Sequence, residues 1–585
     1  MSATYDLVLR GGTIYDGTGD NPFVADIAIS NGIIAEIGRH IAPGSTEIDA
    51  EGLMITPGFV DIHTHYDGQV TWEDSTAPSS VHGVTTVVMG NCGVGFAPCR
   101  AEDRSRLIRL MEGVEDIPEI VMTEGLPWNW ETFPEYLDCV AARSRDIDVA
   151  AQLPHSCLRI FVMGERGARR EPATAEDLDK MREIAREAMT AGAIGFGTSR
   201  TIFHRDSDGN AIPTHQAMET ELLAVASGMA EAGHGVLQAV IDLDSDAHVT
   251  SEVTMLKNVV EGSGRPASFS LAQLRDAPDA YRHALDIVSQ ANQQGLAMKA
   301  QVFGRPTGIL VGLDLSYNFF SRHPTYRNIA HQPLAERVAH MRRPEVRAAI
   351  LAEQPTGEGM VHLDYLGEFD RIFALAETPD YEPGPADTLA ARAQSAGVSA
   401  QEYAYDALLE DEGRAVFLIA FANFADGTLD APLAMLKHEH SLYGLGDGGA
   451  HYGMICDAGF PTFMLTHWTR DRAKGEKLPI AEVVRGLAHK PAQAVGLQDR
   501  GLIAQGYKAD INIIDYDALR LYRPEVLYDL PAGGRRLVQR ADGYRWTIVA
   551  GKPILKDGVP TGEKPGRLVR GPQPVPAVPL TVAAE

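Results

Sequence analysis

Short apolar runs alternate along this chain with longer stretches in which apolar residues recur every three or four positions. The runs at 84–89, 149–153 and 235–240 have the length and apolar character of buried strands. The stretch 175–191 has an acidic first turn and apolar residues at helical spacing, and it leads into another apolar run. Strands that alternate with helices predict βαβ units and a parallel sheet.

Eight apolar runs can be assigned to strands of this sheet. They lie at 55–62, 84–89, 149–153, 194–198, 235–240, 267–271, 296–302 and 442–447. Eight strands alternating with helices predict an α/β fold, a distorted (β/α)8 barrel of the TIM type, over residues 57–499. The segment 303–440 is too long for a connection and mostly helical in pattern, so we interpret it as an inserted subdomain that serves as a lid or recognises substrate.

The two ends of the chain carry a different pattern, of short strands punctuated by turns. Residues 1–56 and 500–563 both show it. Neither half could cover an apolar face alone, so we expect the two to form one split β-sandwich domain. Residues 564–585, which are rich in proline and valine, are predicted to form an extended C-terminal arm.

Composition restricts the partners and the compartment. The formal charge of −27 argues against nucleic acid and anionic membranes as partners and leaves a small-molecule substrate. Five scattered cysteines imply no disulfide framework, and neither a secretory signal nor a run of about 18 apolar residues is found. We therefore expect a cytoplasmic protein, and the sequence is compatible with a homo-oligomer.

Candidate chemistry begins at the end of the first predicted strand. His63 and His65 are two residues apart, so in a strand both imidazoles would project to the same side. Neutral imidazole is a ligand for zinc and other first-row metals. A bare His-x-His pair is more often structural, but the segment Pro57-Gly58-Phe59-Val60-Asp61 that precedes this pair favours a metal site.

The whole segment from Pro57 to His65 resembles the first-strand metal signature of the amidohydrolase superfamily, whose members are metal-dependent hydrolases on a distorted (β/α)8 barrel. Asp447, in Gly446-Asp447-Gly448, ends the eighth predicted strand, where the resemblance implies a metal ligand and proton shuttle. An alternative role is an N-cap for the next helix.

Cys92 distinguishes between branches of the superfamily. Taken alone, a single cysteine is usually a small buried hydrophobe. The segment Gly90-Asn91-Cys92-Gly93, however, resembles the branch that contains the N-acyl-D-amino-acid deacylases (D-aminoacylases), in which a cysteine at this place binds zinc. Residues 193–199 contain no lysine for the carboxylated-lysine alternative, which agrees with that branch.

Strands five and six depart from the pattern of the deacylases, which carry a histidine at the end of each. The corresponding runs here contain Gln238 and Gln273 and no histidine, and glutamine is a weak neutral ligand. His248, in a nearby loop, is a less favoured replacement. The simplest expectation is one zinc ion, or another divalent first-row metal, held by His63, His65 and Asp447, with Cys92 as fourth ligand or neighbour.

Four further residues have weaker assignments. Arg200 is a candidate for binding a substrate carboxylate, although a structural ion pair is an equal alternative. His155 and His451 lie at predicted strand ends and are candidates for orienting substrate. Asp67 is predicted to accept a hydrogen bond from His63 or His65 and so to hold the ring in place without binding the metal itself.

The resemblance implies a hydrolase of non-peptide C–N bonds in which Asp447 accepts a proton from a metal-activated water. An N-acyl-D-amino acid or related acylated amine is the expected substrate. Two alternatives stay open: hydrolysis of a cyclic amide or lactone, and a catalytically inactive barrel that binds a ligand or partner.

Overall fold

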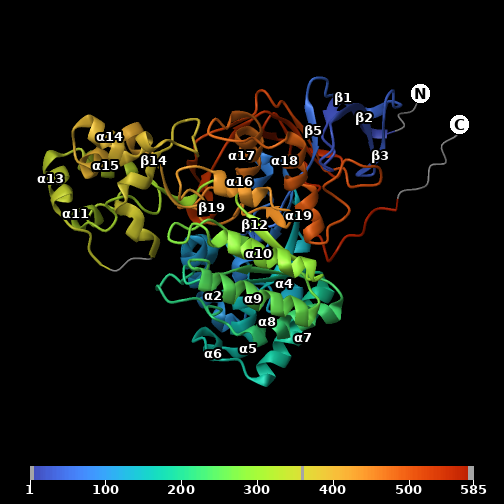
Figure 1. Ribbon diagram of the computed structural model, residues 1–585, viewed down its shortest axis with the longest axis horizontal. Helices are drawn as coiled ribbons and strands as arrows, with labels where there is room; N and C mark the ends of the chain where they lie inside the picture. Colours follow the sequence, from blue (N-terminus) through green and yellow to red (C-terminus); the bar gives the residue numbers. More distant parts are fainter. Residues whose placement is uncertain (1–4, 358–360, 578–585) are drawn as a thin grey trace.

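The computed structural model describes residues 5–357 and 361–577. Its centre is a parallel sheet of eight strands that curls into a barrel with helices outside it (Figure 1). In spatial order the strands are β16 (Ser441–Tyr443), β12 (Met298–Val302), β11 (Ala267–Leu271), β10 (Val236–Val240), β9 (Gly195–Ser199), β8 (Asp148–Pro154), β7 (Val84–Met89) and β6 (Phe59–Asp61). All eight correspond to predicted strands, so the predicted barrel is confirmed.

The ends of the first and eighth strands meet at the barrel mouth. The backbone N–H of Asp447 donates to the carbonyl of His63 at 3.0 Å, and that of His65 donates to the carbonyl of Gly448 at 2.8 Å. These two bonds bring the segments that carry the predicted metal ligands side by side.

Helices between the strands cover the outside of the barrel. The predicted helix at 175–191 is α7 (Ala175–Ala191), which begins at a Thr174 capping box and ends at Gly192. It is followed by α8 (Glu219–Ala232), α9 (Asp246–Ser263) and α10 (Ala280–Gln293). Among the described residues, no helix combines the length and apolarity needed to cross a membrane.

Both chain ends contribute to one nine-stranded sheet beside the barrel, as expected. The N-terminal strands are β1 (Tyr5–Ile14), β2 (Phe23–Ser30), β3 (Ile33–Gly38), β4 (Gly44–Asp49) and β5 (Met54–Pro57), and the C-terminal ones are β17 (Ile511–Ile514), β22 (Tyr544–Val549), β23 (Lys552–Lys556) and β24 (Val559–Pro560). The two groups join where β17 pairs antiparallel with β5. Only Gly58 separates β5 from β6, and a Cβ there would lie 2.2 Å from Thr85 Oγ1.

A buried ion cluster ties this sheet to the barrel. The Asp148 carboxylate on β8 lies 2.7 Å from Arg500 Nη1 and 2.9 Å from Lys508 Nζ. Its other oxygen accepts a hydrogen bond from the Arg567 backbone, at the start of the C-terminal segment. Burial alone would raise the pKa of Asp148, but Lys508 and Arg500 hold it below the ordinary value.

Replacing Asp148 with asparagine is therefore expected to destabilise the protein at pH 7 by about 3–5 kcal/mol, because two buried cations lose the carboxylate they share and each keeps only one, Asp499 for Arg500 and Asp510 for Lys508. A carboxyl group whose pKa is lowered in the folded state stabilises the fold at every pH above its pKa in the unfolded chain, about 3.9. This stabilisation decreases as the pH falls from that value toward the lower pKa of the folded state. The thermal midpoints of wild type and D148N should therefore converge below about pH 4. Asp499→Asn is the matched control, because Asp499 pairs with the same Arg500 at a partly exposed position; equal midpoints for D148N and wild type at pH 7 would contradict the prediction.

The insertion forms a lobe with a core of its own (Figure 1, yellow). The helices of the lobe are α11 (Pro324–Arg327), α12 (Leu334–Met341), α13 (Pro344–Ala352), α14 (Leu389–Ala396) and α15 (Ala400–Leu408), whereas α16 (Asp430–Leu436) of the insertion packs against the barrel. The helices of the lobe share one hydrophobic core with a small antiparallel sheet of β13 (Thr307–Val311), β15 (Phe417–Ala422) and β14 (Ile372–Ala374), which the helical pattern did not reveal. The role of this lobe as a lid stays a prediction.

The C-terminal arm runs against the barrel rather than away from it. Gly566 and Leu568 form single bridges with Arg145 and Val149, and Gln573 bridges to Leu497. The predicted arm thus lies along the strand β8 that carries Asp148; its residues 578–585 lie outside the described part of the chain.

Candidate metal centre

His63 and His65 follow β6 directly and lie at the barrel mouth with side chains 2% and 1% exposed. The backbone N–H of His63 donates to the Asp61 carboxylate at 3.1 Å, which fixes the turn out of the strand. The Nε2 atoms of the two histidines lie 3.5 and 3.6 Å from the same oxygen, Oδ1 of Asp447. Asp447 is the most exposed of the three, at 18%, so it faces the open side of the site.

Cys92 reaches this group from a tight loop that follows β7. Gly90, Cys92 and Gly93 all have positive φ angles, of 89°, 55° and 66°. A Cβ at Gly90 would lie 2.3 Å from the Gln152 carbonyl oxygen and one at Gly93 2.8 Å from the Thr198 Cα, so both positions need glycine. The loop places the Cys92 sulfur 3.4 Å from His63 Nε2 and 3.9 Å from His65 Nε2.

Two contacts behind the histidines orient their rings. Gln301, on β12, has its Oε1 2.9 Å from His63 Nδ1, so this nitrogen carries the proton and Nε2 keeps its lone pair. Glu115, the last residue of α2 (Arg104–Glu115), has its Oε1 3.3 Å from His65 Nδ1. Burial raises the pKa of Glu115 to about 7 and lowers that of His63 to about 4, so His63 is neutral, as a ligand must be.

The donor atoms fit one divalent metal ion. One ligand atom from each of His63, His65 and Cys92 lies within 4.8 Å of the others, and all three side chains are buried. Burial raises the pKa of the Cys92 thiol to about 12, so a thiolate here depends on a cation beside it. For Asp447, contact with the two histidines outweighs burial and lowers the pKa, which keeps it an anionic ligand. Two imidazoles, a thiolate and a carboxylate form a zinc-type ligand set.

Replacing Gln301 with leucine should weaken metal binding about 10- to 100-fold without removing a ligand, because the acceptor that fixes the His63 tautomer is lost. Competition with a chromogenic chelator measures the affinity. Gln332→Leu, at a glutamine in the insertion, is the control, and an unchanged affinity in Gln301→Leu would contradict the orienting role.

Two other predicted residues lie beside the centre. His451 Nε2 lies 3.3 Å from Glu115 Oε2, and its ring centroid lies 6.1 Å from that of His65. Asp67 does not contact a histidine ring as its assignment requires: its Oδ2 accepts the Gly90 N–H at 3.1 Å. It thereby holds the loop that carries Cys92, and burial raises its pKa to about 6.

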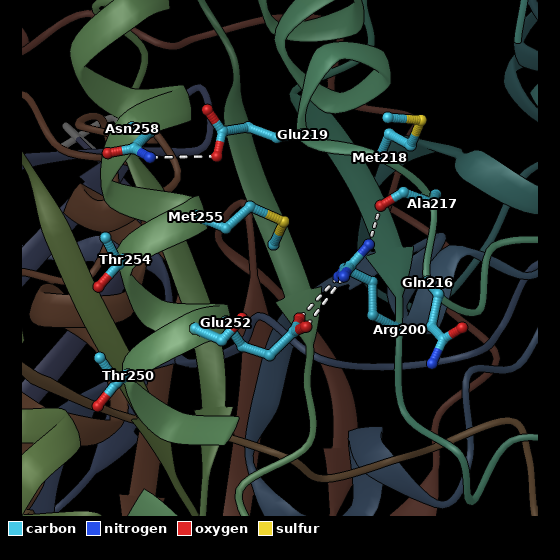
Figure 2. Close-up of a pocket in the computed structure, with 11 residues that line it drawn as sticks. Arg200, Gln216, Ala217, Met218, Glu219, Thr250, Glu252, Thr254, Met255 and Asn258 are labelled. Carbon is cyan, nitrogen blue, oxygen red and sulfur yellow. Dashed lines mark hydrogen bonds and ion pairs between the residues drawn. The ribbon is translucent and has the colours of Figure 1, made fainter. Parts of the chain in front are cut away.

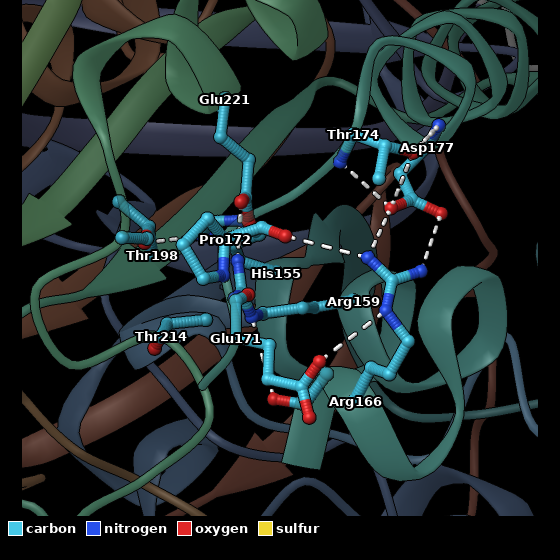
Figure 3. Close-up of polar contacts among 12 residues, drawn as sticks. His155, Arg159, Arg166, Glu171, Pro172, Thr174, Asp177, Thr198, Thr214 and Glu221 are labelled. Carbon is cyan, nitrogen blue, oxygen red and sulfur yellow. Dashed lines mark hydrogen bonds and ion pairs between the residues drawn. The ribbon is translucent and has the colours of Figure 1, made fainter. Parts of the chain in front are cut away.

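His155 belongs to a separate buried network (Figure 3). Its Nδ1 lies 2.8 Å from Thr198 Oγ1 and its Nε2 2.8 Å from Glu221 Oε1, and Arg159 pairs with the same carboxylate. Both ring nitrogens of His155 therefore face this network rather than the metal ligands.

Arg200 forms the structural ion pair that was its alternative assignment. Its guanidinium binds both oxygens of Glu252 in α9, at 2.6 and 2.9 Å, and also the Ala217 carbonyl (Figure 2). These groups line a surface cavity of about 440 Å³. A substrate carboxylate would have to compete with Glu252 for this arginine.

Strands five and six supply no imidazole, as the sequence indicated. Gln238 on β10 is buried and contacts the Cys92 loop, and Gln273 lies just after β11 and donates to Asp426 at 2.8 Å. His248 pairs with Asp244 and its side chain is 56% exposed, so it does not replace them.

Sequence reasoning missed three residues near the site: Glu115, Gln301 and His204. His204 follows β9, its Nδ1 lies 2.9 Å from Ser199 Oγ, and the titratable groups that act on its pKa include His63, His65 and Asp447. Burial lowers its pKa to about 3, so it is neutral. The position of Gln301 at a strand end was an available signal, since barrel sites collect at the C-terminal ends of strands; Glu115 and His204 have no comparable signal.

The sequence matches the profile of the amidohydrolase family over residues 46–555. An uncharacterized protein from Mycobacterium bovis is 27% identical over 94% of this chain and 91% of its own length. D-aminoacylase from Alcaligenes xylosoxydans xylosoxydans is 33% identical over 43% of this chain and 47% of its own.

Solved structures show the same fold. A crystal structure of D-aminoacylase superposes with a TM-score of 0.64 and 21% identity, over 97% of this chain and all of the other. N-acyl-D-glutamate deacylase from Bordetella bronchiseptica, in complex with zinc and a phosphonate inhibitor, gives 0.62 and 22%, over 97% and 99% of the two chains.

The chain therefore belongs to the amidohydrolase family, and the predicted resemblance to its D-aminoacylase-like branch is confirmed. It is a metal-dependent hydrolase of C–N bonds other than peptide bonds, with a divalent metal and a small-molecule substrate.

Proposed function

We propose that the protein hydrolyses the amide bond of an N-acyl-D-amino acid or a closely related acylated amine, with a single zinc ion. The observation that carries the proposal is the convergence of His63, His65, Cys92 and Asp447 at the mouth of the barrel, with the cysteine in the loop after the second strand. Relatives that are named for a reaction and match a third or more of this chain include a D-aminoacylase and deacylases of N-acyl-D-aspartate and N-acyl-D-glutamate.

Zinc is favoured by the ligand types, and a single ion by their number. A thiolate with two imidazoles is a borderline-soft set that suits zinc better than magnesium or calcium. Gln238 lies within strand five and Gln273 just after strand six, where the second ion of the deacylase pattern would need strong ligands.

The residues divide the chemistry between them. A divalent metal held by His63, His65, Cys92 and Asp447 would polarise the amide carbonyl and increase the acidity of a water molecule. Asp447, the most exposed of these groups, accepts the proton as the water oxygen attacks the carbonyl carbon and returns it to the leaving nitrogen. During the reaction, the contact with Gln301 keeps His63 in the neutral tautomer that carries its proton on Nδ1.

The test is a substrate panel with protein loaded with one equivalent of zinc. N-acetyl-D- and N-acetyl-L-amino acids with apolar, acidic and basic side chains are incubated with the enzyme, and the released amine is measured with fluorescamine. We expect turnover of D substrates in preference to their L enantiomers and none with His63→Ala. If the enzyme hydrolyses dihydrouracil or a lactone but none of the N-acyl-amino acids, the alternative of a cyclic substrate replaces the proposal.

A further inference from the structure

Gln238 is the third residue of strand five, β10, beside the loop that carries Cys92, and it has a fixed orientation. Its side chain is buried, with the residue 1% exposed, and its Oε1 lies 3.3 Å from the backbone nitrogen of Cys92. A backbone N–H can be accepted only by the oxygen of an amide group, so this contact determines which end of the amide is which.

The other end of the amide is an unused donor. Gln238 Nε2 is buried and has no hydrogen-bond partner among the residues that the structure describes. Leaving a buried N–H unpaired costs about 1–3 kcal/mol, so such groups in native proteins generally bind a water or a ligand. This donor belongs to the residue that contacts Cys92, whose sulfur lies 3.4 Å from His63 Nε2. The amide group that carries this donor therefore lies beside one of the candidate metal ligands.

We propose that Gln238 Nε2 donates a hydrogen bond to the carbonyl oxygen of the scissile amide and stabilises the negative charge that develops there. The inference rests on the proposed function and adds a catalytic residue to it. As the water oxygen bonds to the carbonyl carbon, the C=O π pair moves onto oxygen and the water proton goes to Asp447. When the C–N bond breaks, the pair returns and the nitrogen takes the proton. Gln238 exchanges no proton and only donates a hydrogen bond.

A glutamine suits this task physically. Its amide is neutral at every working pH, so the donor strength does not vary with pH. The bond from Cys92 fixes the side chain before substrate arrives, so little reorganisation is needed when charge develops. In a buried site each such donor has a large effect on the transition state.

Two variants separate donation from support of the loop. Gln238→Met removes both the donor and the acceptor for Cys92 N–H, whereas Gln238→Glu keeps the acceptor and removes the donor. For both, zinc per chain is measured first. The affinity for a phosphonate analogue of an N-acyl-amino acid, whose tetrahedral oxygens mimic the developing charge, is then measured by calorimetry together with kcat and KM.

We expect Gln238→Met to keep one zinc per chain, to bind the phosphonate about 10²- to 10³-fold more weakly and to lose kcat by the same factor with little change in KM. If the methionine variant loses zinc, the comparison is made with Gln238→Glu, to which the same criterion applies. The inference would be overturned if a fully zinc-loaded variant bound the phosphonate as tightly as the wild-type protein does. It would also be overturned if the wild-type protein did not bind the phosphonate.

The two proposals fail separately. Wild type that hydrolyses no N-acyl-amino acid but binds the phosphonate through Gln238 would end the proposed function and leave the donor assignment intact. If the wild-type protein hydrolyses N-acyl-amino acids and the zinc-loaded variants keep the same kcat, the proposed function stands and the donor assignment fails.

Discussion

Replacement of Asp447 with asparagine is expected to lower kcat at least about 10³-fold, because it removes the only carboxylate that contacts both His63 and His65 among the described residues. Asparagine has almost the same shape but cannot accept a proton from water at neutral pH. Contact with the two histidines lowers the pKa of Asp447, so the wild-type group is ionised across the working range. Steady-state kinetics on the best substrate of the panel measures the effect.

The zinc content of D447N separates its two roles. His63, His65 and Cys92 are unchanged, so we expect the variant to bind zinc, more weakly than wild type, and to be assayed at full occupancy. Asp457→Asn is the control: Asp457 lies ten residues further along the chain and pairs with Arg305, so its loss should lower the thermal midpoint and change kcat only a few-fold. A fully loaded D447N with wild-type kcat would exclude Asp447 as the base.

The barrel could be predicted because its strands are buried on both faces. All six residues of β7 and all seven of β8 are buried, and such strands give continuous apolar runs that stand out from the helical spacing around them. The antiparallel sheet of the insertion was missed for the opposite reason. β14 has three residues, too few to show a period, and its partner β15 follows more than forty residues later.

The four candidate ligands could be proposed from the sequence because their spacing is local, whereas the contacts of their supporting partners could not. His63 and His65 belong to one turn, and Cys92 and Asp447 each lie in a glycine-bounded loop at the end of a strand. Gln301, by contrast, meets His63 from 238 residues away. The closure of the barrel creates such pairs, and the spacing of apolar and polar residues along the sequence does not predict them.

The same limit explains Arg200 and His155. Each is a polar residue near a strand end, and the sequence pattern is compatible with a role at the mouth. Their carboxylate partners, Glu252 and Glu221, lie 52 and 66 residues along the chain on helices outside the barrel. Only the fold shows that both side chains are already paired.

Replacement of Cys92 with alanine should weaken zinc binding at least about 100-fold, a larger loss than that expected for Gln301→Leu, because a direct ligand is removed. Wild type purified without chelator should contain one zinc per chain by plasma mass spectrometry, and C92A should lose it on dialysis. His63, His65 and Asp447 alone leave the ion with three ligands, fewer than the four of a closed tetrahedral site.

Cys99→Ala is the matched control, because Cys99 is also buried and lies seven residues further on, where its sulfur faces the Arg100 carbonyl instead of the histidines. It should retain one zinc. Retention of zinc by C92A with wild-type affinity would remove the thiolate from the ligand set. Two ions per wild-type chain would require ligands beyond the four residues and would contradict the single-ion site. A zinc-free wild type that takes up no added zinc would favour a barrel that binds its ligand without turnover.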